Sequence, residues 1–112
     1  MPKRLVELLI FERCPNGDVA LEHARAAMKR VGVDSELRMV VVQTDEDARR
    51  LHFLGSPSVR IDGLDVDASA RTRSDFGLQC RIYVFEGRIL GAPPTQWIAD
   101  ALRGDLAVEE TF

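Results

Sequence analysis

The feature that most constrains the fold is a dense apolar run at residues 4–11, followed closely by a helical pattern and a second β-rich run. A run of this density is typical of a strand that is buried on both faces of a sheet. Over residues 19–31 apolar side chains recur at three- and four-residue spacing, which predicts a helix. Residues 37–42 are rich in valine and predict a second strand. This order predicts a parallel β-α-β unit with a right-handed crossover.

The second half of the chain has weaker signals. Four elements are expected there: a short helix at 44–52, strands at 58–61 and 81–85, and a last helix introduced by Pro93-Pro94-Thr95. The last two strands are expected to form an antiparallel pair. The polar stretch 64–78 is long for a loop in a compact domain, so it is either functional or mobile. We therefore expect one domain over residues 1–104 and a tail at 105–112.

Composition excludes several classes of protein. Of the 112 residues, 46% are hydrophobic and 29% charged, which predicts a folded chain rather than a disordered one. The net charge of −3, without a basic cluster, gives no electrostatic reason to expect nucleic acid or an anionic membrane as a partner. The longest apolar run is too short to span a bilayer, and no export signal is recognised. Two cysteines fit a reducing compartment, so a cytoplasmic location is expected.

Two short motifs carry a family resemblance. Cys14-Pro15-Asn16-Gly17 stands where the first strand gives way to a helix, and Gly55-Ser56-Pro57-Ser58 precedes the third strand. With the order of elements, these motifs make residues 4–103 resemble the thioredoxin-like superfamily. The resemblance implies an α/β, three-layer β-α-β-α-β-β-α sandwich with a mixed four-stranded sheet. It also implies a cis peptide bond before Pro57, facing the Cys14 sulfur.

A narrower resemblance involves a third segment. Gly77-Leu78-Gln79-Cys80-Arg81, taken with the Ser56-Pro57 segment, is similar to a group of small bacterial thioredoxin-like proteins, some of them labelled as related to alkylmercury lyases. That label leaves open a protein that handles an organomercurial or metal–thiol species.

The chain departs from the dithiol pattern at one position. Gly17 stands where a Cys-x-x-Cys enzyme has its second cysteine, so Cys14 resembles the single thiol of monothiol glutaredoxins. A helix N-terminus stabilises an anion, which favours a reactive thiolate at Cys14. The alternative is an inert cysteine that fills space at a strand end.

The resemblance also implies how a partner is held. Cys14 would be the nucleophile of a thiol–disulfide oxidoreductase that acts through a mixed disulfide. Its partner, a low-molecular-weight thiol or a thiol/disulfide protein, would contact Pro15, Asn16, Gly17, Ser56 and Pro57, with the main chain of Ser56 pairing with it. No cofactor is implied, and either a monomer or a homodimer is compatible. The non-enzymatic alternative is a thioredoxin-fold adaptor that only binds a partner.

Cys80 is the second thiol of the chain. If residues 81–85 formed the fourth strand of the sheet, Cys80 would lie about 15 Å from Cys14. A disulfide requires Cα atoms within about 7 Å, so a buried or structural role is expected for Cys80, with a resolving role as the alternative. His23 and His52 share no short ligand spacing with the cysteines, so no metal site is expected. We expect His23 at the surface and His52 at a helix C-terminus.

Overall fold

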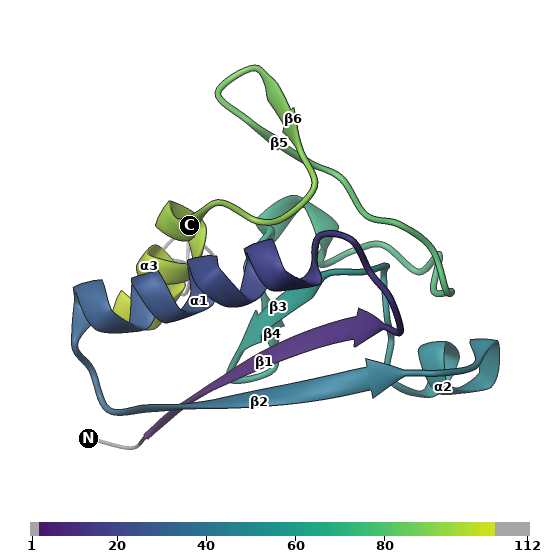
Figure 1. Cartoon of the computed structure of the whole chain (residues 1–112), viewed down its shortest axis with the longest axis horizontal. Helices are drawn as coiled ribbons and strands as arrows, with labels where there is room; N and C mark the ends of the chain where they lie inside the picture. The colour runs from purple at the N-terminus through teal and green to yellow at the C-terminus, as the bar shows by residue number, and fades with distance from the viewer. Residues whose placement is uncertain (1–2, 105–112) are drawn as a thin grey trace.

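A four-stranded mixed sheet forms the centre of the molecule (Figure 1). The computed structural model describes residues 3–104, so the predicted tail at 105–112 lies outside the described residues. The elements in chain order are β1 (Arg4–Phe11), α1 (Gly17–Val31), β2 (Ser35–Val42), α2 (Asp45–Arg50), β3 (Ser58–Ile61), β4 (Leu64–Asp65), the 3-10 helix η1 (Ala68–Ala70), β5 (Tyr83–Phe85), β6 (Arg88–Leu90) and α3 (Thr95–Arg103). Between residues 3 and 104, no helix combines the length and the apolar character that crossing a bilayer requires.

The strand order in the sheet is β2-β1-β3-β4. β1 pairs with β2 in parallel along eight residues, which confirms the predicted β-α-β unit. β3 runs antiparallel to β1, and β4 runs antiparallel to β3. The mixed four-stranded sheet and the α/β class are therefore confirmed.

The prediction that residues 81–85 form the fourth strand of this sheet is wrong. That place is taken by β4, which lies in the stretch read as a loop. Asp62 and Gly63 both have positive φ, of 51° and 86°, so the chain reverses in a tight turn immediately after β3. A strand of only two residues, one of them charged, leaves no alternating pattern for a sequence analysis to detect.

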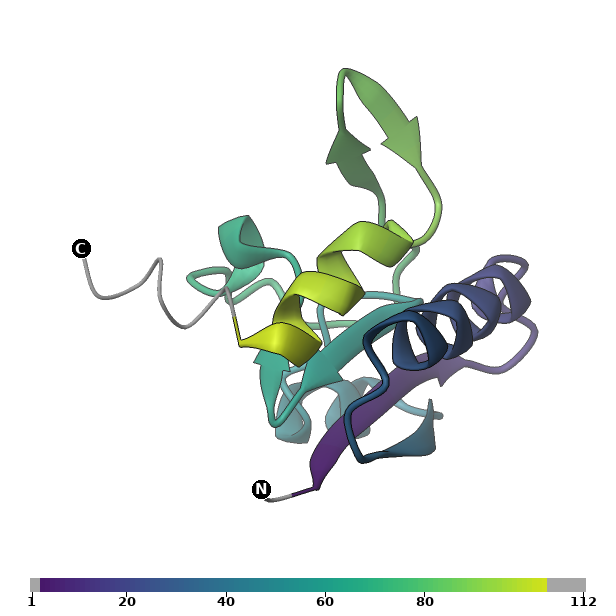
Figure 2. The same ribbon diagram turned by 90° about the vertical axis from the view of Figure 1, so that its left-hand side faces the viewer.

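β5 and β6 instead form a separate two-stranded hairpin. The hairpin projects away from the rest of the chain (Figure 2). Val84 and Ile89 are paired across the hairpin and are 61% and 72% exposed. These β-branched residues therefore favour the extended strands of the hairpin but are not part of a buried core. Trp97, from α3, makes edge-to-face contacts with Tyr83 at the base of the hairpin and with Phe85 at the end of β5.

Helices α1 and α3 pack together on one face of the sheet (Figure 2). α1 buries Ala20, Ala24 and Ala27, whose spacing places them on a single stripe against the main core cluster. Gly32, in the left-handed conformation at φ 72°, ends the helix. The helix begins at Gly17, two residues earlier than predicted, with Asn16 as its N-cap, so Pro15 lies just before it.

The opposite face of the sheet has a smaller core. Leu9, Val42, Ala48 and Phe53 are buried there, and Ala48 belongs to the short helix α2. The Thr44 hydroxyl caps α2 by accepting from the Asp47 N–H at 3.0 Å. The helix ends at Arg50, two residues before the predicted end, so it covers only part of this face.

A buried ion pair lies on the same face of the sheet, next to β3 and β4. The side chain of Arg81 is 1% exposed and that of Asp65 is 8% exposed. Two parallel hydrogen bonds join them: Nη1 to Oδ2 at 2.6 Å and Nη2 to Oδ1 at 2.9 Å. Arg81 Nη1 also donates to the Ser58 hydroxyl at 2.9 Å, and the guanidinium lies 4.6 Å from the centre of the Tyr83 ring. The pair thus links β3, β4 and the base of the hairpin.

Replacing Asp65 with Asn removes the carboxylate that binds Arg81 at both nitrogens and leaves the buried charge only the Asp67 carboxylate, 3.8 Å away. We therefore expect the free energy of unfolding to fall by about 3 kcal/mol. The exposed Glu36–Arg38 pair on β2 provides the matched control, because Glu36→Gln removes the same charge at the surface and should cost at most about 1 kcal/mol. Urea denaturation of both variants measures the difference. Equal losses would show that the Arg81–Asp65 pair contributes no more than a surface pair.

Candidate functional site

Cys14 lies in the turn that joins β1 to α1. Its N–H donates to the Phe11 carbonyl at 3.3 Å, and its own carbonyl accepts from the Gly17 N–H at 3.2 Å. Arg13, at φ 65°, has the left-handed backbone conformation that sharpens this turn. The thiol is free and half-buried, directly before the N-terminus of α1. Neither Cys14 nor Cys80 forms a hydrogen bond through its sulfur with any residue that the structure describes.

The next residues of the motif pack closely. Pro15 is exposed, Asn16 is half-buried and Gly17 is buried. Asn16 caps α1 without a hydrogen bond from its side chain. Instead its amide lies against Gly91, where an added Cβ would overlap it. The segment after β6 thus comes close to the Cys14 turn, and a side chain at position 91 would force the Asn16 amide to move. No sequence pattern predicts this contact.

The segment before β3 contains the predicted cis peptide bond. The Ser56–Pro57 bond is cis, and Pro57 is among the fully buried residues. The Ser56 hydroxyl accepts from the Phe11 N–H at 3.2 Å, while the carbonyl of Phe11 accepts from Cys14. Through Phe11, the proline segment and the Cys14 turn therefore meet at one end of β1. Tyr83 donates its hydroxyl hydrogen to the Pro57 carbonyl.

The main chain of Ser56, predicted to pair with a partner, is already hydrogen-bonded within the chain. Its N–H donates to the Gln79 carbonyl at 2.8 Å, and its carbonyl accepts from the Arg81 N–H at 3.1 Å. Gly55 permits this contact: its φ is 125°, and a Cβ there would lie 3.0 Å from the Gln79 oxygen. A partner can use these groups of Ser56 only if residues 79–81 move away.

Cys80 is consequently not where the sequence analysis placed it. The expected separation of about 15 Å assumed that residues 81–85 belonged to the central sheet. Because β4 fills that place, the chain after η1 runs back toward the proline segment, and Cys80 forms a parallel β-bridge with Ser56. Cys80 is free and exposed rather than buried, so the expected buried role is wrong. A bridge of a single residue pair has no sequence signature, so the position of Cys80 beside Ser56 could not be predicted.

The two histidines lie apart from this site. His23 is half-buried rather than at the surface, with its Nδ1 atom 2.8 Å from the Pro93 carbonyl oxygen. His52 follows the C-terminal end of α2 and stacks on Phe76, with ring centres 4.7 Å apart. Among residues 3–104, no three His, Cys, Asp or Glu side chains are grouped so that they could hold a metal ion.

The space at Gly17 allows a direct test of the dithiol geometry. A Cβ at this position would lie 3.8 Å from the Cys14 Cβ and no closer than 3.7 Å to Ile10, so it fits without a clash. About 3.8 Å is the mean Cβ–Cβ distance in disulfides. In a Cys80→Ser background, Gly17→Cys should therefore allow a disulfide between Cys14 and the introduced thiol to form on mild oxidation.

Thiol titration and non-reducing mass spectrometry should find no free thiol in the oxidised Gly17→Cys variant. Gly17→Ser in the same background is the control and should retain one thiol. Two persistent free thiols in the Gly17→Cys variant would show that the turn lacks the geometry of a dithiol site.

Comparison with known proteins identifies no family. No protein-family model, curated protein or solved structure matches the chain.

Proposed function

We propose that the chain is a thioredoxin-like protein that exchanges thiols and disulfides through Cys14 alone. One observation carries the proposal: the half-buried Cys14 and the cis Ser56–Pro57 bond are both held at Phe11, the last residue of β1. The N–H of Cys14 donates to the Phe11 carbonyl, and the N–H of Phe11 donates to the Ser56 hydroxyl. The strand order, with β1 and β2 parallel and β3 and β4 antiparallel to their neighbours, supports the proposed superfamily.

The proposed reaction has two steps. The Cys14 thiolate attacks one sulfur of a small disulfide; a new S–S bond forms, the original S–S bond breaks, and the other half leaves as a thiolate that takes a proton from water. A second small thiolate then attacks the sulfur of the bound half, so that this half leaves as a new disulfide and Cys14 is released. The external thiol is the reductant, because Gly17 supplies no resolving sulfur.

The surrounding residues have distinct proposed roles. Pro15 is exposed beside the thiol and can contact the bound group, while Pro57 shapes the buried side of the site. Asn16 and Gly17 form the start of α1 beside the thiol; the Gly17 N–H already donates to the Cys14 carbonyl, which leaves the N–H of Asn16 as the main-chain donor for a partner. Ser56 orients the turn through its hydroxyl, since its main-chain groups are engaged by residues 79–81. A reducing cytoplasmic compartment would supply the small thiol.

One observation favours the second candidate, a non-catalytic adaptor. The edge of Ser56 that would pair with an extended partner is filled by residues 79–81 of the chain itself. An adaptor would bind its partner elsewhere and need no reactive thiol. The two candidates differ in the chemistry of Cys14.

The test exposes the reduced protein to hydroxyethyl disulfide and follows adduct formation by intact-mass spectrometry. We expect the hydroxyethylthio adduct on Cys14 to form at least about tenfold faster than on Cys80, because the helix N-terminus favours the attacking thiolate. Peptide mapping locates the adduct, and an added small thiol should remove it.

Two variants complete the test. Cys14→Ser should lose the fast adduct, whereas Cys80→Ser should retain it at the wild-type rate. Slow labelling of both cysteines at the same rate would overturn the oxidoreductase proposal and favour the adaptor. A fast wild-type reaction that yields a Cys14–Cys80 bridge would show that Cys80 is the resolving thiol.

A further inference from the structure

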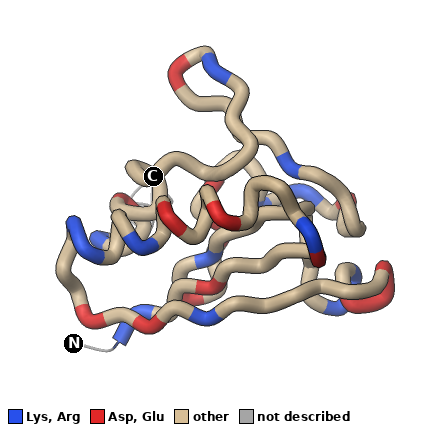
Figure 3. Tube along the Cα trace, viewed as in Figure 1, with Lys and Arg blue, Asp and Glu red and all other residues tan. Residues whose placement is uncertain are grey.

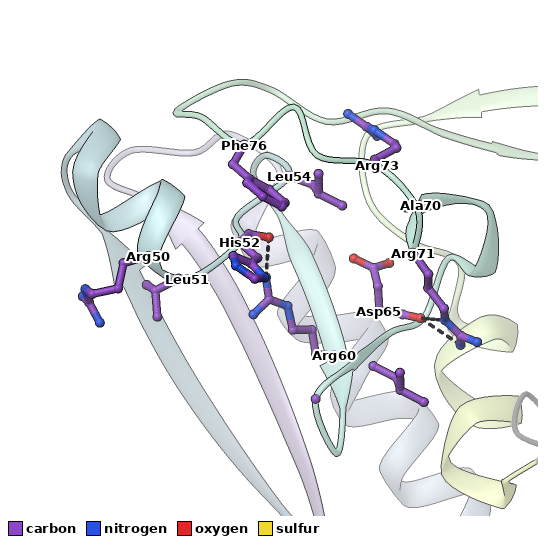
Figure 4. A pocket seen from close by; sticks show the side chains of 12 residues that line it. Arg50, Leu51, His52, Leu54, Arg60, Asp65, Ala70, Arg71, Arg73 and Phe76 are labelled. Atoms are coloured by element: carbon purple, nitrogen blue, oxygen red, sulfur yellow. Dashed lines mark hydrogen bonds between the residues drawn. The ribbon is translucent and has the colours of Figure 1, made fainter.

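A pocket lies on the face of the sheet that carries α2, away from the core between α1, α3 and the sheet. It has a volume of about 260 Å³ and opens between the end of α2, the β3–β4 hairpin and the loop after η1 (Figure 4). Arg60 lies between Val59 and Ile61, both in the core under α1 and α3, so its side chain projects to the opposite face. The volume is slightly below the roughly 300–1,000 Å³ of sites for drug-sized ligands, which indicates a small ligand.

The lining of the pocket is predominantly cationic. Four arginines contribute to it, Arg50, Arg60, Arg71 and Arg73, against the single carboxylate of Asp65. That carboxylate is already bound through both oxygens to Arg81, which is buried behind it. Arg50 and Arg73 each make one ion pair, with Asp47 and Asp75. Arg71 donates through Nε and Nη2 to the Asp65 carbonyl at 3.1 Å, so the charge that the pocket offers a ligand comes mainly from Arg60.

Arg60 occupies the key position because its charge is half-buried. Its Nη2 atom donates to the His52 carbonyl at 2.8 Å, and it makes no ion pair with any residue between 3 and 104. Glu7 and Asp65 are its neighbours on the two adjacent strands. Burial lowers the pKa of Arg60, and the charges of Asp65 and Glu7 offset this only in part. An anion in the pocket would compensate the remaining cost of burying this charge.

An apolar wall of the pocket is formed by Leu54 and by the stacked rings of His52 and Phe76. His52, at φ 55°, directs its carbonyl to Arg60, and its ring stacks on Phe76 with an interplanar angle of 6°. Leu54 lies beside this stack (Figure 4). Arg73 donates to both oxygens of Asp75 at 2.9 and 2.7 Å, and this contact lowers the pKa of Asp75 to about 2. This exposed pair joins two residues of the loop that borders the pocket.

We propose that this pocket binds a small organic oxyanion, a carboxylate or a phosphate ester with a compact planar body. Its anionic oxygens would accept hydrogen bonds from Arg60, since a guanidinium group matches the geometry of carboxylate and phosphate. Its planar body would lie against Leu54 and Phe76, where an apolar group loses contact with water. The site does not involve Cys14 and stands independently of the proposed thiol chemistry.

The probes are phenyl phosphate, benzoate, inorganic phosphate and uncharged benzyl alcohol. Each is titrated into the ¹⁵N-labelled full chain at low ionic strength, with amide chemical shifts as the readout. At least one of the two aromatic anions should shift the amides of residues 50–54 and 70–76, and bind more tightly than inorganic phosphate or benzyl alcohol. The one that binds more tightly identifies the class as phosphate ester or carboxylate.

Arg60→Gln should weaken binding of the preferred anion about tenfold, the effect of a lost hydrogen bond between charged groups. Arg73→Gln removes a positive charge from the rim of the pocket and leaves the Asp75 carboxylate there without it, so it should weaken binding about threefold or more. This variant decides the outcome if Arg60→Gln does not fold in a thermal melt. Arg38→Gln, which removes an exposed arginine paired with Glu36 on β2, is the matched control and should bind as wild type.

Three results would overturn the proposal. They are the absence of shifts around the pocket with both aromatic anions, benzyl alcohol binding as tightly as the anions, and unchanged affinity in folded Arg60→Gln and Arg73→Gln. Phe76→Ala separates the two halves of the site: it should weaken binding of the aromatic anion and leave inorganic phosphate unaffected. Equal weakening of both probes would contradict the proposed contact with the planar body.

Discussion

The buried contact between Arg81 and Asp65 is the interaction on which the arrangement of the second half of the chain depends. Removing two charges from water costs several kcal/mol per ion, and only a paired, well-oriented geometry offsets that cost. Here the guanidinium binds both oxygens of Asp65 and the hydroxyl of Ser58, while the N–H of Arg81 donates to the Ser56 carbonyl. One residue therefore fixes β4 against β3 and holds the strand-like segment 79–81 beside the cis-proline bond.

The Arg81–Asp65 contact also lies between the candidate thiol site and the arginine-lined pocket, which are connected by residues 56–60. Between Ser56 and Arg60 the chain passes from the candidate thiol site to the arginine-lined pocket. Asp65 lines that pocket and binds Arg81, whose neighbour Cys80 bridges to Ser56. Figure 3 shows basic and acidic residues distributed over many elements rather than gathered on one, so the pocket is a local arrangement within a chain of net charge −3.

The features predicted correctly from sequence are those set by local patterns. The runs at residues 4–11 and 19–31 are long and strongly periodic, so β1 and α1 follow from side-chain burial alone. β4 was missed because two residues carry no periodicity, and the hairpin strand Tyr83–Phe85 was misplaced because its alternation does not specify its partner. The burial of Arg81 could not be predicted, because it depends on a carboxylate sixteen residues earlier in the chain. The site could be predicted around Cys14 and Pro57, but the position of Cys80 could not.

The packing around position 17 has an evolutionary consequence. A side chain the size of cysteine fits there without moving Ile10, and the neighbouring Cys14 already lies at the right separation. Glycine and cysteine codons can differ by a single base. Under the proposed thiol exchange, one base change at codon 17 would therefore add or remove a resolving thiol while the scaffold stays the same.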